Sequence, residues 1–159
     1  MKEFIISTQI QFFSLDELSA EDRQLVEEAR QMTRTSYSPY SHFQVGAALR
    51  LADGRLFRGS NQENAAFPTG LCAERTVFFA AQANAPEVAP VAIAIAAYTN
   101  GAFTEKPVSP CGSCRQALLE AETRYHQPIR VLLYGTEGVY VIQSMKALLP
   151  LDFDCSELA

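Results

Sequence analysis

Residues 91–97, Val-Ala-Ile-Ala-Ile-Ala-Ala, form an almost unbroken apolar run with the length of a β-strand. Such a run is expected for a strand that is covered on both faces of a sheet. The sequence then predicts a helix from Cys111 to about Tyr125 and a second strand over residues 129–133. Strand, helix and strand in this order make a crossover unit, so the two strands are predicted to be parallel.

The flanking segments add further strands and helices to this unit. Alternating apolar residues at 43–51, a turn signal at Asp53-Gly54 and a return strand through residues 56–57 predict a hairpin. Another strand is predicted at 139–142, and helices over about 20–38, 72–84 and 144–149. We therefore expect an α/β fold with three layers, α/β/α, in which helices cover both faces of a mixed sheet of about five strands.

The first seventeen residues are predicted to be an extension in front of a single domain at 18–159. Every second residue from Phe4 to Phe12 is apolar or β-branched, a pattern that indicates a possible extra strand. An equally good interpretation is a clamp that packs on a neighbouring subunit.

The composition excludes several classes of function. A net charge of −5 and the absence of any run of Lys and Arg argue against a nucleic-acid partner. No segment approaches the ~20 apolar residues that span a bilayer, and the N-terminus lacks the features of a signal peptide. Three of the four cysteines fall in two short motifs, which is typical of metal binding rather than disulfides and favours a reducing, cytoplasmic setting.

The two cysteine motifs are 72–75, Cys-Ala-Glu-Arg, and 110–114, Pro-Cys-Gly-Ser-Cys. Each begins a predicted helix, where the partial positive charge of the helix N-terminus favours a thiolate. Cys72, Cys111 and Cys114 are therefore predicted to bind one Zn²⁺ per chain. Structural zinc sites close with four protein ligands, whereas catalytic sites leave one position for water, and no fourth ligand with suitable spacing is evident here.

Three charged residues in or next to these motifs have predicted roles beside the metal. Glu74 is placed to take a proton from water and pass it on. Arg75 and Arg115 are expected to donate hydrogen bonds to the sulfurs and so to offset the negative charge of three thiolates. A structural zinc knuckle or a redox pair would explain the Cys-x-x-Cys spacing but leaves Cys72 and Glu74 without a task.

Together these motifs resemble the zinc-dependent cytidine deaminases, in their short form with three cysteine ligands. The resemblance runs from about Tyr37 to Phe153 and includes 40–49, Tyr-Ser-His-Phe-Gln-Val-Gly-Ala-Ala-Leu, and 61–66, Asn-Gln-Glu-Asn-Ala-Ala. It implies hydrolysis of cytidine and deoxycytidine to uridine and deoxyuridine with release of ammonia, as in pyrimidine salvage.

The resemblance also implies roles for individual residues. The Ala73 backbone N–H would contact the base and Phe43 would lie along the ring, although simple core packing explains Phe43 equally well. Asn61 and Glu63 would bind the sugar 3′-hydroxyl; the alternative is a polar loop that caps its own backbone. Phe153 would enter a neighbouring subunit's pocket in a homotetramer, unless it covers its own core.

Two other functions stay open at this stage. One is a deaminase of a cytosine-nucleoside antibiotic of the blasticidin S type, whose family shares the three cysteines and the glutamate. The other is a zinc-stabilised binding module without turnover. Comparing turnover of cytidine with turnover of the antibiotic distinguishes the first alternative from a cytidine deaminase. The effect of changing Glu74 on turnover distinguishes the second.

Overall fold

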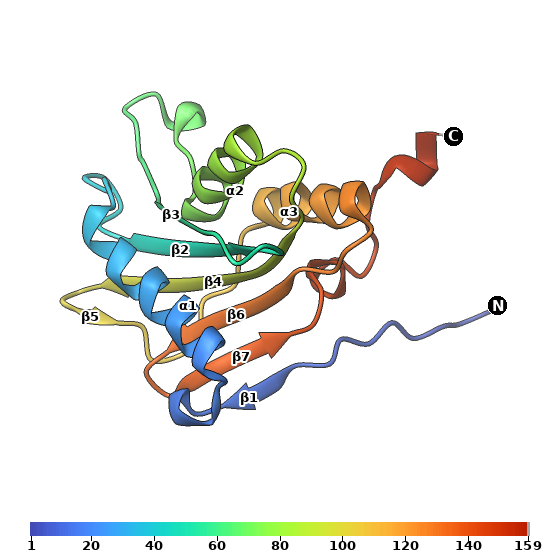
Figure 1. Cartoon of the computed structure of the whole chain (residues 1–159), viewed down its shortest axis with the longest axis horizontal. Helices are drawn as coiled ribbons and strands as arrows, with labels where there is room; N and C mark the ends of the chain where they lie inside the picture. The colour runs from blue at the N-terminus through green and yellow to red at the C-terminus, as the bar shows by residue number, and fades with distance from the viewer. Residues whose placement is uncertain (159) are drawn as a thin grey trace.

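The computed structural model describes residues 1–158, in which seven strands form one mixed sheet (Figure 1). The strand order is β1-β7-β6-β4-β2-β3, and β5 pairs with β4 beside this path. The strands are β1 (Gln11–Phe13), β2 (Gln44–Leu51), β3 (Leu56–Ser60), β4 (Pro90–Thr99), β5 (Ala102–Phe103), β6 (Arg130–Gly135) and β7 (Gly138–Ile142).

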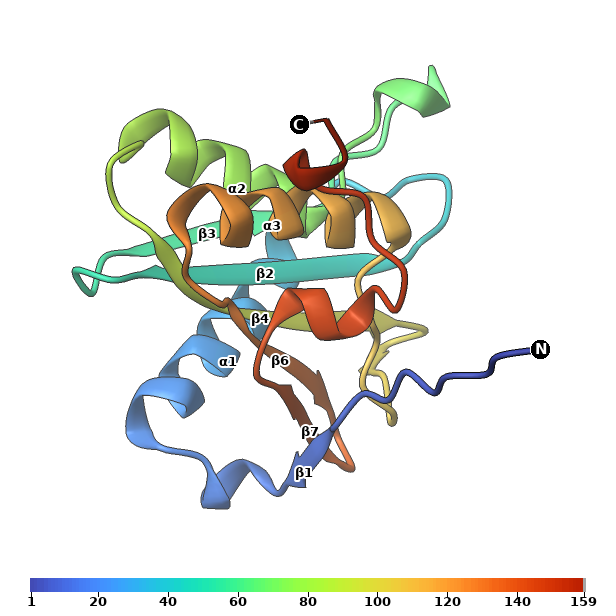
Figure 2. The ribbon, with the colours of Figure 1, turned by 90° about the vertical axis from the view of Figure 1, so that its right-hand side faces the viewer.

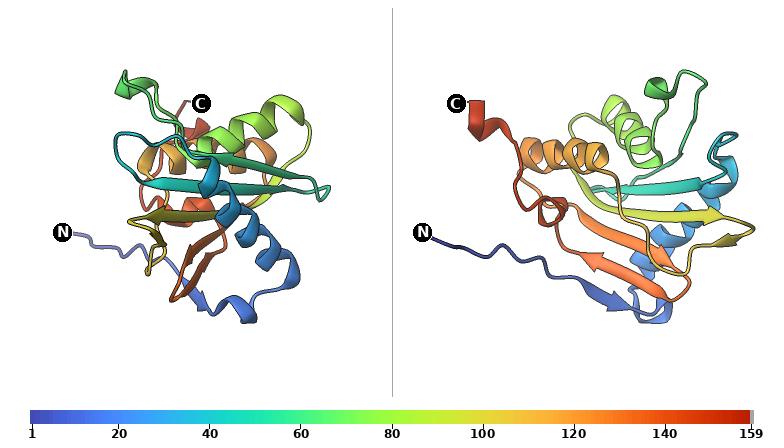
Figure 3. Two further views of the ribbon diagram at one scale, coloured as in Figure 1. Left: turned by 90° about the vertical axis from the view of Figure 1, so that its left-hand side faces the viewer. Right: turned by 180° about the vertical axis from the view of Figure 1, so that it is seen from behind.

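Three longer helices cover the sheet on its two faces, as Figures 1 and 3 show. Helix α1 (Ala20–Met32) packs on one face, and α2 (Ala73–Asn84) and α3 (Gly112–Tyr125) pack on the other. Alternate residues of β4 divide between the two cores: Ile93 and Ile95 face α2 and α3, whereas Ala92 and Ala94 face α1. The predicted three-layer α/β/α architecture is confirmed.

The crossover unit forms as the sequence predicts. Strands β4 and β6 are parallel, in a register that places Ala92 beside Arg130 and Ile95 beside Leu133. The other pairings in the sheet are antiparallel, including the predicted hairpin of β2 and β3. Helix α3 connects β4 to β6 and therefore lies beside α2 on the same face.

Helix α1 approaches β2 so closely that only glycine fits at position 46. A Cβ atom on Gly46 would lie 2.1 Å from the carbonyl oxygen of Ala29 and 2.6 Å from the backbone nitrogen of Thr33. Both are backbone atoms and cannot rotate away. The glycine thus sets the distance between the α1 layer and the sheet.

A buried ion pair fixes the start of α1, which begins after the predicted cap Ser19. The side chain of Asp22 has no exposed surface and contacts Arg50 at 3.2 Å and Arg130 at 2.7 Å. Arg50 comes from β2, and its side chain reaches Asp22 of α1, whereas Arg130 comes from β6. One carboxylate thus ties the helix to two separate strands.

The number of strands departs from the expected five because two short strands were not anticipated at their observed positions. Strand β5 follows a tight turn in which Asn100 and Gly101 have φ of 52° and 81°, values typical of a type I′ hairpin. Strand β1 has only three residues, so the extra strand predicted from the alternation at 4–12 forms only at its end. Its partner β7 ends at Ile142, just beyond the Gln11–Val141 pair, and residues before Gln11 have no strand beside them.

The segment after β7 forms the 3₁₀ helix η4 (Met145–Leu148) in place of the short helix expected at 144–149. The buried carboxylate of Glu122 in α3 accepts hydrogen bonds from the backbone N–H groups of Met145, Lys146 and Ile129 and from the Ser144 hydroxyl. Helix η4 is thereby fastened to α3. Within the part of the chain that the structure describes, no helix is both long and apolar enough to cross a bilayer.

Candidate zinc and active site

The N-termini of α2 and α3 bring the three predicted ligands together (Figure 2). Cys72 is the N-cap of α2, Cys111 is the N-cap of α3, and Cys114 lies in the first turn of α3. The Sγ atom of Cys111 is 3.8 Å from that of Cys72 and 3.4 Å from that of Cys114. All three sulfurs lie within 4.8 Å of one another.

This arrangement fits zinc. Zn–S bonds of about 2.3 Å in a tetrahedral site separate two sulfurs by about 3.8 Å, close to the observed distances. Within residues 1–158, the group that can hold an ion contains these three cysteines and no fourth His, Asp or Glu. All are free thiols rather than disulfides. Cys72, Cys111 and Cys114 thus form a zinc-binding group with one coordination position left for a non-protein ligand.

The pKa values of two of the thiols are shifted in opposite directions. Hydrogen bonding from Cys114 lowers the pKa of Cys72 to about 5, and Arg75 adds to this effect. The same hydrogen bond, together with burial, raises the pKa of Cys114. Arg75 makes the expected contact, because its Nη2 atom lies 3.7 Å from the Cys72 sulfur. Cys72 is therefore the more acidic and Cys114 the less acidic of these two thiols.

Glu74 lies in the first turn of α2 and is buried. Burial raises the pKa of this carboxyl above its ordinary value, and the negative charge of Cys72 raises it further. A carboxyl group with a raised pKa is suited to accept and release a proton near neutral pH. Its position beside the thiols agrees with the role predicted from the sequence.

Arg115 does not make the expected hydrogen bond to a sulfur. Its Nε atom donates to the carbonyl of Pro110 and its Nη1 atom to the carbonyl of Leu148, both at 2.9 Å. Because Pro110 immediately precedes the ligand Cys111, the guanidinium braces the ligand loop against η4. The expectation for Arg115 is therefore wrong: within residues 1–158 its side chain contacts backbone carbonyls. Of the two arginines, Arg75 is the one that contacts a thiol.

A cavity of about 330 Å³ opens beside the thiols. This volume is at the lower end of the range typical of small-molecule sites, about 300–1,000 Å³. The predicted residues Phe43, Asn61 and Ala73 line it together with Glu74, and most of the cavity surface is apolar. The complete lining consists of Ser41, Phe43, Val45, Asn61, Cys72, Ala73, Glu74, Ile95, Val108, Ser109 and Cys111.

Phe43 and Asn61 are held at the cavity wall by one network. The Asn61 amide accepts from the Val45 N–H at 2.8 Å and donates to the Phe43 carbonyl at 2.9 Å, and it also accepts from the Ser36 hydroxyl. The Phe43 ring is half-buried and belongs to neither core cluster of the described residues. Asn61 therefore does cap backbone, as the alternative interpretation has it, and it also borders the cavity.

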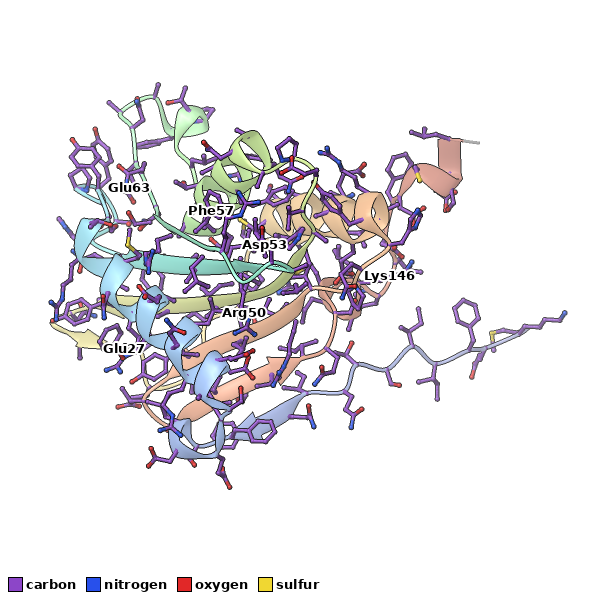
Figure 4. All side chains as sticks on the ribbon, viewed as in Figure 1. Glu27, Arg50, Asp53, Phe57, Glu63 and Lys146 are labelled. Carbon is purple, nitrogen blue, oxygen red and sulfur yellow. The ribbon has the colours of Figure 1, made fainter. Side chains whose placement is uncertain are left out.

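Glu63 lies in the loop that follows β3, and its side chain contacts the loop that precedes β2 (Figure 4). Its Oε2 atom accepts from the backbone N–H groups of Tyr40 and Ser41 at 2.9 and 3.3 Å. Hydrogen bonding to Ser41 lowers the pKa of this half-buried carboxyl. Glu63 lines an adjacent cavity of about 380 Å³, and Ser41 lines both cavities. The two hollows are thus neighbours.

The remaining predicted residue, Phe153, lies outside the cavity. Its ring is 57% exposed, so it does not cover the core of its own chain. The Gln116 side chain donates to its carbonyl at 2.8 Å and holds this part of the tail against α3. A cavity of about 450 Å³ around Tyr37, His42 and Tyr98 is larger than the others, but none of the cysteines or Glu74 borders it.

Sequence reasoning missed several residues of the cavity wall. Val108 and Ser109 directly precede the Pro110-Cys111 motif, and Ser41 lies within the motif at 40–49. Proximity to a motif was the available signal for these three. Ile95 gave no such signal, because it lies in β4 and reaches the site only through the packing of α2 on the sheet.

Comparisons with known proteins agree with this geometry. Residues 19–127 match the family profile described as "Cytidine and deoxycytidylate deaminase zinc-binding region". A cytidine deaminase of Halalkalibacterium halodurans is 48% identical over 100 residues, which cover 62% of this chain and 71% of that protein. One of Sporosarcina psychrophila is 44% identical over 96 residues, covering 60% of this chain and 66% of that protein.

Solved structures give the same result. The chain superposes on a cytidine deaminase from Burkholderia pseudomallei with a TM-score of 0.70 and 38% identity, covering 86% of this chain and 100% of that one. For a cytidine deaminase from Mycobacterium tuberculosis the TM-score is 0.67 at 30% identity, and the coverage is 86% and 99%.

Proposed function

Because the chain belongs to the cytidine and deoxycytidylate deaminase family, we propose that it hydrolyses cytidine and deoxycytidine to uridine and deoxyuridine with release of ammonia. The observation that carries this proposal is one cavity lined by two of the three zinc-binding cysteines and a buried glutamate. A purely structural zinc site has no need of an adjoining cavity or of a carboxylate with a raised pKa.

The chain's own residues supply the proton transfers. Zinc, when bound, provides the Lewis acid that makes water nucleophilic near neutral pH. Glu74 takes a proton from that water and delivers it to ring N3 as oxygen adds to C4. It then passes the remaining proton to the departing amine, so that ammonia leaves and the carboxylate is restored. The raised pKa of Glu74 suits both directions of transfer.

The base is positioned by Ala73 and Phe43. Ala73 is the first residue of α2, so its backbone N–H has no acceptor within the helix and is available to a polar edge of the base. The Phe43 ring lines the same cavity and offers an apolar face to the base. Asn61 holds the backbone of Phe43 through the hydrogen bond to its carbonyl.

The sugar is assigned to the side of the site where Asn61 and Glu63 lie. Asn61 borders the cavity of the cysteines, Glu63 borders the adjacent one, and Ser41 joins the two. A carboxylate accepts from a hydroxyl group, and an amide both donates and accepts. We assign these two side chains to the 3′-hydroxyl, a group that ribose and deoxyribose share.

The test is direct. Purified zinc-loaded protein is incubated separately with cytidine and with blasticidin S, and ammonia release is followed in both. We expect turnover of cytidine, because the relatives described above are cytidine deaminases. Turnover of the antibiotic alone favours the rival deaminase, and turnover of neither by a zinc-loaded protein favours the binding module.

We further propose a cytoplasmic homotetramer in which residues 18–159 are the deaminase domain and residues 1–17 an extension. The family match begins at residue 19, next to this boundary. Free thiols that must stay reduced to bind zinc suit the cytoplasm. The exposed Phe153 ring is available to a neighbouring copy. Light scattering of the native protein tests the assembly: a mass of one or two chains contradicts it.

A further inference from the structure

The N-terminal segment 1–10, here called the arm, leaves the body of the molecule as an extended chain (Figures 1 and 3). It carries large apolar side chains in full contact with solvent, with Phe4 82% and Ile5 94% exposed. Ile6 and Ile10 are also exposed. Exposed apolar side chains gathered in one segment mark an interaction surface. The match to the deaminase family begins only at residue 19, so the proposed chemistry does not explain the arm.

Among residues 1–158, no strand of the same chain pairs with the arm. Its continuation, β1, pairs with β7 only over Gln11–Phe13, because the chain then turns from β7 into η4. One side-chain hydrogen bond holds the arm near η4, from the Thr8 hydroxyl to the Ala147 carbonyl at 2.5 Å. Within residues 1–158, the other edge of β1 is unpaired and therefore open to a further strand.

The sequence of the arm and β1 is symmetric about Thr8. The residues on one face of an extended chain here are Phe4, Ile6, Thr8, Ile10 and Phe12. If two copies pair antiparallel with Thr8 opposite Thr8, Phe4 lies opposite Phe12 and Ile6 opposite Ile10, each pair occurring twice. Such apolar cross-strand pairs are the unit of sheet stabilisation. A shift by one residue would send the two apolar rows to opposite faces of the sheet.

The charges near the ends agree with the same register. With Thr8 opposite Thr8, Lys2 of one copy lies opposite Ser14 of the second copy. Ser14 begins the acidic 3₁₀ helix η1 (Leu15–Glu17), in which Glu17 already accepts from Ser14 and Asp16 lies between them in sequence. The arm's lysine therefore lies near an acidic turn at each end of the pairing, while Glu3 lies opposite Phe13. The charges are compatible with this register, and the apolar pairs select it.

We propose that the arm pairs with the arm of a second copy of this chain, as an antiparallel ribbon about a two-fold axis through Thr8. This contact is isologous, since each copy uses the same residues, and it continues the sheet of one copy into that of the other through β1. Nine residues per copy bury less than the roughly 800 Å² per partner of a standard interface. The ribbon therefore joins copies that also meet elsewhere, and it is best tested by its register rather than by mass alone.

Cysteine substitutions test the register. Directly opposite residues of an antiparallel pair have Cα atoms about 4.5–5.5 Å apart, within reach of a disulfide. In a Cys155→Ser background, Thr8→Cys is expected to form a covalent dimer under mild oxidation. Ser7→Cys is the matched control, because the two Ser7 residues would be offset by two positions and about 8 Å apart. We expect it to cross-link at least tenfold more slowly.

A second pair of variants tests the apolar face. Ile6→Asp added to Thr8→Cys is expected to abolish the cross-link, because it puts a charge opposite Ile10. Gln9→Asp is expected to leave the cross-link intact, since Gln9 lies on the other face. Turnover of cytidine by each variant serves as the control for folding, because the arm does not border the active-site cavity.

Equal cross-linking by Thr8→Cys and Ser7→Cys would show random collisions and overturn the proposal. The absence of any cross-link in active protein would also overturn the proposal and would assign the arm to a different partner.

Discussion

At the scale of single residues, the proposed mechanism gives the metal and the protons to different side chains. Cys72, Cys111 and Cys114 provide the sulfurs, and the buried carboxyl of Glu74 lies beside them. This division of roles can be tested, because a change at Glu74 need not disturb the three cysteine ligands.

Glu74→Gln is expected to lower turnover of cytidine by about a thousandfold or more, because the amide cannot accept a proton from water. Zinc content and thermal unfolding are expected to match those of the unchanged protein, since the amide has the same shape as the carboxyl. Steady-state kinetics and a metal count on the same preparation measure both. An unaltered rate would remove Glu74 from the mechanism.

Zinc affinity is expected to depend on pH through Cys114. The pKa of this thiol is raised in the metal-free site, so it is protonated at neutral pH, and zinc must displace that proton. Lower pH therefore weakens binding, by about tenfold per pH unit for each proton displaced. Competition with a chromophoric chelator at two pH values one unit apart measures the slope. Equal affinity at both would contradict the assignment of the proton.

Spacing alone predicted that the three cysteines lie together with Glu74 beside them, because two short motifs at predicted helix starts leave few other geometries. It did not predict the direction of Arg115, whose nearest acceptors come from Pro110 and from Leu148, far along the chain. The contacts of Asn61 with β2 likewise depend on how the hairpin packs. Local patterns show which groups are present, and tertiary packing decides where a long side chain points.

At the scale of secondary-structure elements, the start of α1 is the clearest case for a stability measurement. Asp22→Asn removes the charge that Arg50 and Arg130 share in a buried position. We expect a loss of about 2–3 kcal/mol in the free energy of unfolding. Glu21→Gln is the control: its side chain is 80% exposed and 3.6 Å from Arg50, so the change should be within about 0.5 kcal/mol.

Urea titration of zinc-loaded protein at one fixed protein concentration compares the two variants. Equal losses for both would mean that the buried carboxylate contributes no more than the exposed one.

The loop that follows β3 makes a prediction about substrates. If Asn61 and Glu63 bind only the 3′-hydroxyl, loss of the 2′-hydroxyl removes no contact with them. Deoxycytidine is therefore expected to be turned over with kcat/KM within about tenfold of that for cytidine, a difference of less than about 1.4 kcal/mol. Parallel assays with the two nucleosides measure the ratio. Turnover of cytidine with deoxycytidine inert would contradict the assignment.

The elements themselves were largely predictable, with two instructive exceptions. The Asn100-Gly101 pair is a strong hairpin signal, yet the strand after it has only two residues and too little pattern to be recognised. Residues 4–12 show the alternation of a strand, but β7 ends before it can pair with most of them. A periodic pattern predicts the conformation of a segment, whereas strand pairing needs a neighbour that the pattern does not specify.

At the scale of the whole molecule, the three-layer fold places the N-termini of α2 and α3 next to each other. The crossover through α3 puts it beside α2, and the Cys72–Cys111 contact joins their starts. The two ends of the chain leave the body on the same side, as Figure 1 shows, and both carry exposed apolar side chains. The pattern of the sequence predicts the fold of one chain. It does not predict how copies of the chain assemble, because assembly depends on which surfaces of the folded chain stay exposed.

The central claim is that three sulfurs and one non-protein ligand surround the metal. X-ray absorption at the zinc edge of active, purified protein measures this most directly. We expect three sulfur neighbours at about 2.3 Å and one oxygen at about 2.0 Å. A fourth sulfur or a histidine nitrogen in the first coordination sphere, or full activity in protein without zinc, would contradict the claim.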